Sequence, residues 1–153
     1  MIQRIQTLFL LLSLACTSVL FFFPFGEVVV SNGPSVKMMI LGSEFLKDGN
    51  AEYYSLLPLL IMIIIVNLIS LVSIFLYKKR MLQIRLNIFN LVLQFGITGL
   101  MFYFLTNAAK NYGVDYSTGI LVVLPIVAAI LSLLAVRSIA KDEALVKSIS
   151  RLR

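Results

Sequence analysis

The chain has 153 residues, of which 60% are hydrophobic and only 13% are charged. Average globular proteins are about 45–50% apolar and about 25% charged. A chain this short has too much surface to hide so many apolar side chains in a water-soluble core. The composition therefore argues against a soluble enzyme, a disordered tail and a nucleic-acid-binding protein, and predicts a single membrane domain over residues 1–153.

Four long apolar runs without Asp, Glu, Lys or Arg dominate the chain. They cover residues 5–25, 56–77, 86–105 and 119–136. Each approaches the ~20 residues that a helix needs to cross about 30 Å of hydrocarbon. The runs predict an all-α membrane protein, an antiparallel four-helix transmembrane bundle. A cleaved signal peptide is the alternative for the first run, but that run exceeds the usual apolar region of roughly 7–15 residues.

Basic residues gather before the first run, between the second and third runs, and after the fourth. These segments hold ten of the thirteen lysines and arginines. The positive-inside rule places them on the cytoplasmic side, which predicts a bacterial inner-membrane protein with both termini in the cytoplasm. The candidates for contact with anionic lipid headgroups are Lys78, Lys79, Arg80, Arg85, Lys147 and Arg151. A role as topology signals alone also accounts for the Lys78–Arg85 cluster.

The longest segment between runs, residues 26–55, faces the outside in this arrangement. Within it the β-prone runs 28–30 and 36–40 flank residues 31–35, which include Asn, Gly and Pro. This pattern predicts a small outer β-hairpin between the first two helices. The short cytoplasmic link makes the second and third helices antiparallel neighbours.

The fourth run and the tail after it carry two further signals. Small residues at Ala128, Ser132 and Ala135 predict close helix packing. Pro125 predicts a bend or a local break in the helix because it removes a backbone donor. Apolar positions recur at helical spacing through the tail, residues 138–153. We expect a helix there, either continuing the fourth span or lying along the inner membrane surface. A frayed end is the alternative.

Polar residues follow one stripe of the third run, at Asn87, Asn90, Gln94 and Thr98, with spacings of three, four and four. The second run offers Asn67, Ser70 and Ser73. The favoured interpretation is hydrogen bonding between helices, with Gly96 and Gly99 allowing close approach; the other is a polar path for a substrate. The candidate interhelical polar contacts are Asn67, Ser70, Asn87, Asn90 and Gln94.

Depth along the two helices makes this prediction specific. Asn67 lies ten residues before Tyr77, and Gln94 lies ten residues after Ile84. At 1.5 Å per residue both are about 15 Å from the inner end. We expect Asn67 and Gln94 to share a hydrogen bond, with Asn90 close to Ser70 one turn lower.

The usual parts of an active site are missing from the sequence. There is no histidine, Cys16 is the one cysteine, and all seven carboxylates lie outside the four runs. The commonest general base and metal ligand are therefore absent, as is the intramembrane charge typical of a proton relay. Serines within the runs more often bond their own backbone. We expect no enzyme activity, no cofactor and no metal site.

The two ends of the chain resemble a known family. Met1–Leu8 running into the first apolar run, and residues 142–148 with Arg151–Arg153, are similar to the ends of small four-span membrane proteins from Bacteroidota. That family is catalogued only as a domain of unknown function. The resemblance implies an inner-membrane location and supplies no activity, substrate or site.

These observations lead to a functional expectation. The sequence favours a non-catalytic accessory, scaffold or assembly subunit in the membrane. A small transporter or lipid-handling protein, using the Asn/Gln stripe, is the alternative. The expected partners are the lipid bilayer and either other membrane proteins or a second copy of the chain, with no nucleic acid.

Overall fold

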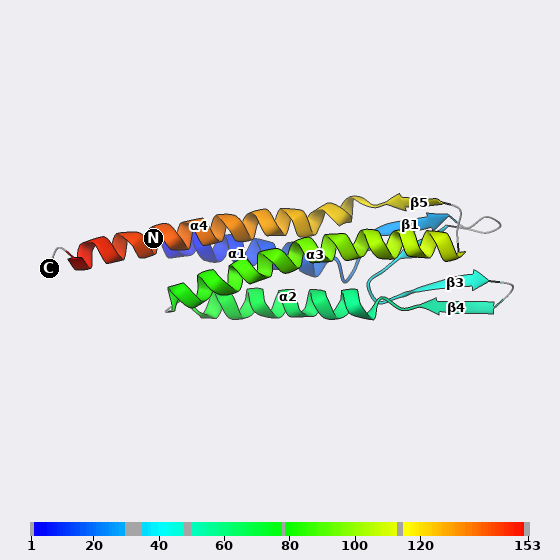
Figure 1. The fold of residues 1–153 in the computed structure, drawn as a ribbon, viewed down its shortest axis with the longest axis horizontal. Coiled ribbons are helices and arrows are strands. Elements are labelled where there is room, and N and C mark those ends of the chain that lie inside the picture. The colour runs from blue at the N-terminus through cyan, green and yellow to red at the C-terminus, as the bar shows by residue number, and fades with distance from the viewer. Residues whose placement is uncertain (1, 30–34, 48–49, 78, 113–114, 152–153) are drawn as a thin grey trace.

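In the computed structural model, the described residues are 2–29, 35–47, 50–77, 79–112 and 115–151, and most of them are helical. They form four long helices, five short strands and one 3-10 helix (Figure 1). The helices are α1 (Ile2–Val19), α2 (Leu57–Phe75), α3 (Arg80–Tyr112) and α4 (Leu124–Arg151), with the 3-10 helix η1 (Ile120–Val123) just before α4. The strands are β1 (Gly26–Val29), β2 (Val36–Met38), β3 (Ser43–Lys47), β4 (Asn50–Tyr54) and β5 (Asp115–Thr118).

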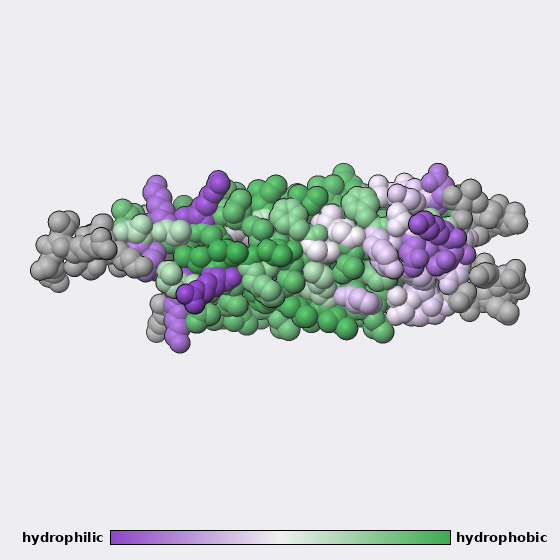
Figure 2. All heavy atoms as spheres, in the orientation of Figure 1, coloured by the Kyte–Doolittle hydropathy of each residue, from purple (hydrophilic) through white to green (hydrophobic). Residues whose placement is uncertain are grey.

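The four helices pack in a ring in which α1 contacts α2 and α4, and α3 contacts the same two helices. All five strands lie at one end of this bundle (Figure 1). The N-terminus, the connection between α2 and α3, and the far end of α4 lie at the opposite end. On the face drawn in Figure 2, an apolar belt separates hydrophilic residues at the two ends. This distribution suits a molecule whose middle lies in hydrocarbon.

Among the described residues, three helical segments are long and apolar enough to cross a membrane: Leu57–Phe75, Arg80–Tyr112 and Ile120–Leu145. The apolar part of α1, Ile5–Val19, is shorter. The first apolar run was expected to be helical as far as residue 25, but α1 ends at Val19. Pro24 cannot donate a helical hydrogen bond, and the backbone N–H of Phe25 instead donates to Met38 O at 3.0 Å.

Helix boundaries differ from the predicted runs at α3 and α4. α3 has 33 residues, about 50 Å at 1.5 Å per residue, so it extends beyond the run 86–105 at both ends. The fourth run is locally interrupted beside Pro125, as expected, because the 3-10 helix η1 gives way there to the α-helix α4. α4 begins at Leu124, so Pro125 falls in its first turn, where the absent N–H has no helical partner to lose. At its other end α4 continues through the tail to Arg151.

The outer strands form two small sheets. β1 pairs antiparallel with β2, with Glu27 opposite Lys37, which brings together the two runs expected to pair. The turn predicted between them, residues 31–35, lies mostly outside the described residues. β1 also pairs antiparallel with β5, giving the order β2-β1-β5, and β3 pairs with β4. The sequence reading anticipated neither β5 nor the second sheet.

An aromatic cluster joins the second sheet to the C-terminal end of α3. Phe45 of β3 is 1% exposed and stacks on Tyr112, with ring centroids 4.6 Å apart. Tyr54 of β4 meets Phe45 and Phe104 edge-on, at 6.0 and 6.2 Å. Asn107 Nδ2 donates to the Tyr54 hydroxyl at 2.9 Å. The C-terminal end of α3 is therefore the surface on which this sheet packs.

Gly119, directly before η1, lies against the backbone at the start of β1. Its backbone N–H donates to Phe25 O at 2.9 Å, and a Cβ added to it would lie 2.9 Å from that same oxygen. Because this oxygen belongs to the backbone, it cannot move away by a change of rotamer as a flexible side chain could. We expect Gly119→Ala to lower the free energy of unfolding by about 1 kcal/mol or more, measured by thermal denaturation in detergent.

Gly99 provides the matched control for this substitution. It lies within α3, and a Cβ added there would meet nothing within 4 Å. The expected role of Gly99 in close helix approach is therefore wrong, whereas a Cβ on Gly96 would meet Met62 Cε at 2.5 Å. Gly99→Ala should stabilise the helix by roughly 0.5–1 kcal/mol. Equal effects of the two substitutions would contradict the close approach inferred at Gly119.

Candidate functional site: a polar seam between the helices

The core-facing stripe of α3 changes from polar to apolar along its length. In the half nearer Arg80 it carries amide side chains that are at most 5% exposed: Gln83, Asn87, Asn90 and Gln94. In the half nearer the strands it carries Ile97, Met101 and Leu105, each 0% exposed. The spacings of three and four residues keep all of them on one face. The bundle therefore has an apolar half beneath the sheets and a half whose interior is polar.

Amide and hydroxyl side chains join α3 to α2 in the polar half. Asn90 Nδ2 donates to Ser70 Oγ at 2.7 Å, and Asn87 Nδ2 donates to Ser73 Oγ at 2.6 Å. Gln83 Nε2 donates to the backbone oxygen of Ser73 at 3.0 Å. We call these five residues the α2–α3 seam. The expected proximity of Asn90 and Ser70 is present.

A second hydrogen-bonded group joins α3 to α1 and α4 near the centre of the bundle. Gln94 Nε2 donates to Ser13 Oγ at 3.2 Å, and the hydroxyls of Ser13 and Ser132 are 3.0 Å apart. The Ser13 hydroxyl also lies 3.0 Å from the backbone oxygen of Ala128. Gln94 therefore links three helices, a role that its place on the stripe alone does not reveal.

The predicted hydrogen bond between Asn67 and Gln94 is wrong. Asn67 Oδ1 instead accepts from Thr17 Oγ1 on α1, at 2.5 Å. The depth argument ignored rotation about the helix axis. Asn67 precedes Ser70 by three residues, and at 3.6 residues per turn it points about 60° away from it. Ser70 faces α3, so this rotation turns Asn67 towards α1, the other neighbour of α2.

Sequence reasoning also missed the polar residues of the first helix. Gln6, Ser13 and Thr17 are all less than 9% exposed. Gln6 Nε2 donates to Asp142 Oδ2 at 2.5 Å, which ties the start of α1 to the extension of α4. Their spacings of seven and four residues place them on one helical face. That periodicity was the available signal.

Three buried polar atoms have no hydrogen-bond partner in the part of the chain that the structure describes. They are Asn87 Oδ1, Asn90 Oδ1 and Arg80 Nη1. Both asparagine side chains are 0% exposed. Nearly all buried polar atoms in folded proteins find a partner in protein or ordered water. These three atoms all belong to one stripe of α3 and mark it as the candidate functional site.

Of the basic residues proposed for lipid contact, Lys79, Arg80 and Arg85 lie at or beside the start of α3, at the end of the bundle away from the strands. Lys79 and Arg85 are exposed, and Arg80 is partly buried. Lys78 lies outside the described residues, as do the side chains of Lys147 and Arg151 on α4. Contact of these residues with headgroups stays a prediction.

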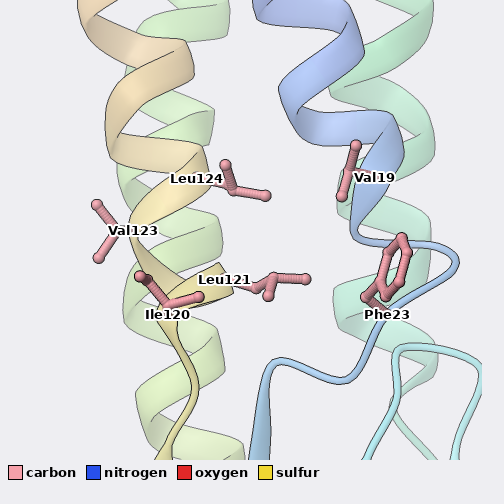
Figure 3. Close-up of a pocket in the computed structure, with 6 residues that line it drawn as sticks. All are labelled: Val19, Phe23, Ile120, Leu121, Val123 and Leu124. Carbon is pink, nitrogen blue, oxygen red and sulfur yellow. The ribbon is translucent and has the colours of Figure 1, made fainter.

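An apolar pocket of about 440 Å³ lies between the end of α1 and the start of α4 (Figure 3). Val19 and Phe23 line one side of it, and residues 120, 121, 123 and 124 line the other. The lining offers no polar surface, so the pocket suits hydrocarbon and cannot orient a polar substrate by hydrogen bonds. Within the described residues, no three Cys, Asp or Glu side chains gather as metal ligands would.

The fold and the seam define a small, mainly helical protein whose long apolar helices suggest a membrane location. Over residues 2–152 the chain matches the family described as "Domain of unknown function (DUF4293)", and it belongs to that family. No curated protein matches the chain.

Proposed function

We propose that the protein is a four-span inner-membrane protein that acts without catalysis, as a scaffold or assembly subunit. Three helical segments have the length and composition of membrane spans. α1 is the proposed fourth span, because it packs along α4 and along α2 and so occupies the same apolar belt. Origin in Bacteroidota is part of the proposal and rests on the likeness of the chain ends.

The hydrogen bonding of Gln94 carries this proposal. A transported polar substrate needs side chains that are free to bind it. Gln94, the most central amide of the stripe, is instead bonded to Ser13 and Ser132. Thr17 and Asn67 are likewise paired with each other. Polar groups that hydrogen-bond to neighbouring helices are not available to bind a substrate, and they stabilise a filled bundle. Such a bundle favours recognition by other proteins through its outer surface.

Affinity purification in mild detergent tests the scaffold function. A tagged chain should retain a stoichiometric membrane-protein partner or a second copy of itself through size-exclusion chromatography. Recovery of the chain as a monomer without partners would contradict the proposal. The transporter remains the second candidate, and the unpaired oxygens of Asn87 and Asn90 are the observation in its favour.

Topology is the part of the proposal with the most direct test. Ten of thirteen basic residues fall in three segments of the sequence, and those segments meet at the end of the bundle opposite the strands (Figure 1). The positive-inside rule then predicts cytoplasmic signals from reporter fusions at the N-terminus, near Lys79 and after Arg153. A fusion at Asn32 should report the outside, and a cytoplasmic signal there would overturn the arrangement.

A further inference from the structure

The α2–α3 seam contains two oxygen atoms that require a hydrogen-bond donor. Asn87 Oδ1 and Asn90 Oδ1 are buried and have no partner among the described residues. The amide nitrogens of both residues are already engaged, with Ser73 and Ser70. Turning either amide over would offer its oxygen to a serine and leave an NH₂ group facing the unpaired position. In either amide orientation, therefore, one polar atom of each asparagine is left without a hydrogen-bond partner.

The spacing of the two asparagines fits a single small donor. They are three residues apart on α3, an axial rise of about 4.5 Å. One water molecule that donates two hydrogen bonds of about 2.8 Å spans two acceptors roughly 4.5 Å apart, which is comparable with this rise between the two residues. Ser70 and Ser73, three residues apart on the antiparallel α2, bring their hydroxyls to the same two levels. The seam thus offers the two to four polar partners that a buried water needs.

The charges around the seam favour a neutral donor over a cation. The five seam residues are uncharged, so a cation would be held by neutral oxygens alone. An unpaired charge is costly in the interior of a bilayer. Arg80 lies seven residues before Asn87, on the same face of α3, and its positive charge opposes the entry of a cation. Its buried, unpaired Nη1 can itself donate to water, which makes that end of the stripe polar as well.

We propose that the α2–α3 seam binds an ordered water molecule, which donates to Asn87 Oδ1 and Asn90 Oδ1 and reaches the site from the Arg80 end of α3. The site lies between two helices of one chain and needs no other protein. A test of this water site is therefore independent of a test of the scaffold function. It also accounts for the observation that otherwise favours a transporter.

Solid-state NMR of the full chain in lipid vesicles tests the site without altering it. With ¹⁵N-labelled Asn and Gln, magnetisation transferred from water should reach the side-chain amides of Asn87 and Asn90. Gln94 is the internal control, because it is equally buried and its amide is bonded to serines on α1 and α4. We expect a transfer several-fold stronger at the two asparagines than at Gln94. Transfer as weak as at Gln94 would overturn the proposal.

Two further measurements separate water from other occupants. Exchanging sodium chloride for choline chloride should leave the resonances of Asn87 and Asn90 in place, and a shift would indicate a bound cation and overturn the proposal. Asn90→Leu removes one of the two acceptors and should reduce the transfer at Asn87. Asn67→Leu, outside the seam, should not. Equal transfer at Asn87 in both variants would also contradict a shared water.

Discussion

Replacing Phe45 by alanine is expected to release the second sheet from the end of α3 while the helix bundle persists. Phe45 is 1% exposed and stacks on Tyr112 at 4.6 Å. Removal of a buried phenylalanine side chain costs about 3–5 kcal/mol. An isolated two-stranded sheet is at best marginally stable in water, so the pairing of β3 with β4 should not survive this loss.

Amide hydrogen exchange in lipid nanodiscs measures this effect by region. The amides of β3 and β4 should exchange at least roughly 100-fold faster, since each 1.4 kcal/mol is a factor of ten. The central turns of α2 and α4 should keep their protection. Phe22→Ala is the matched control, because the Phe22 side chain is 77% exposed. Unchanged exchange in β4 of the Phe45 variant would show that the aromatic cluster does not hold the sheet.

Local patterns in the sequence predicted those features that depend on a single element. The apolar runs located α2 to within two residues at each end, and they located the middle of α3 and of α4 but not the ends of these two helices. The 3.6-residue period identified the polar stripe of α3. The buried side of that stripe is the predicted one, with Asn87, Asn90 and Gln94 each 0% exposed. Within one helix, the spacing of residue types along the sequence determines which residues share a face. The buried face of a single helix can therefore be predicted without a structure.

Features that depend on how elements are placed around each other could not be predicted in this way. Whether Asn67 meets Gln94 or Thr17 depends on a rotation of about 60° about α2, and no local pattern records that rotation. The pairing of β1 with β5 joins Gly26 to Thr118, residues that are separated along the chain by three strands and two helices. The charged residues Asp115 and Lys110 nearby gave no indication of a strand partner.

The two halves of the bundle are stabilised by different kinds of contact. Beneath the sheets the helices share apolar side chains such as Ile63, Ile97 and Met101, all 0% exposed. In the other half, amides and hydroxyls connect helices whose outward-facing side chains are largely apolar. Apolar packing between helices has little driving force of its own in lipid. Directional bonds in this half therefore specify which helices are neighbours, and small residues allow those neighbours to approach.

The contact between α1 and α4 depends on such small residues and should fail when one is enlarged. Ala128 and Ala135 of α4 are 0% exposed, and so are Ser132 and its partner Ser13 on α1. The backbone oxygen of Ala128 lies 3.0 Å from Ser13 Oγ. Ala128→Leu adds three carbons at this contact. Overpacking of this kind costs about 1–3 kcal/mol, and we expect the upper end because neither helix backbone can withdraw without losing the bonds to Gln94.

Reversible unfolding in detergent with increasing sodium dodecyl sulfate measures this destabilisation. Val127→Leu is the matched control, because it enlarges the neighbouring side chain, which is 38% exposed. Val127→Leu should leave the unfolding midpoint unchanged, whereas Ala128→Leu should lower it clearly. Ser13→Ala, which removes hydroxyl bonds without adding volume, should fall between them, near the ~0.6 kcal/mol typical of a polar contact in a membrane. If Ala128→Leu instead matched Val127→Leu, close packing of α1 on α4 would not be what holds α1 in the bundle, and its assignment as the fourth span would lose its main support.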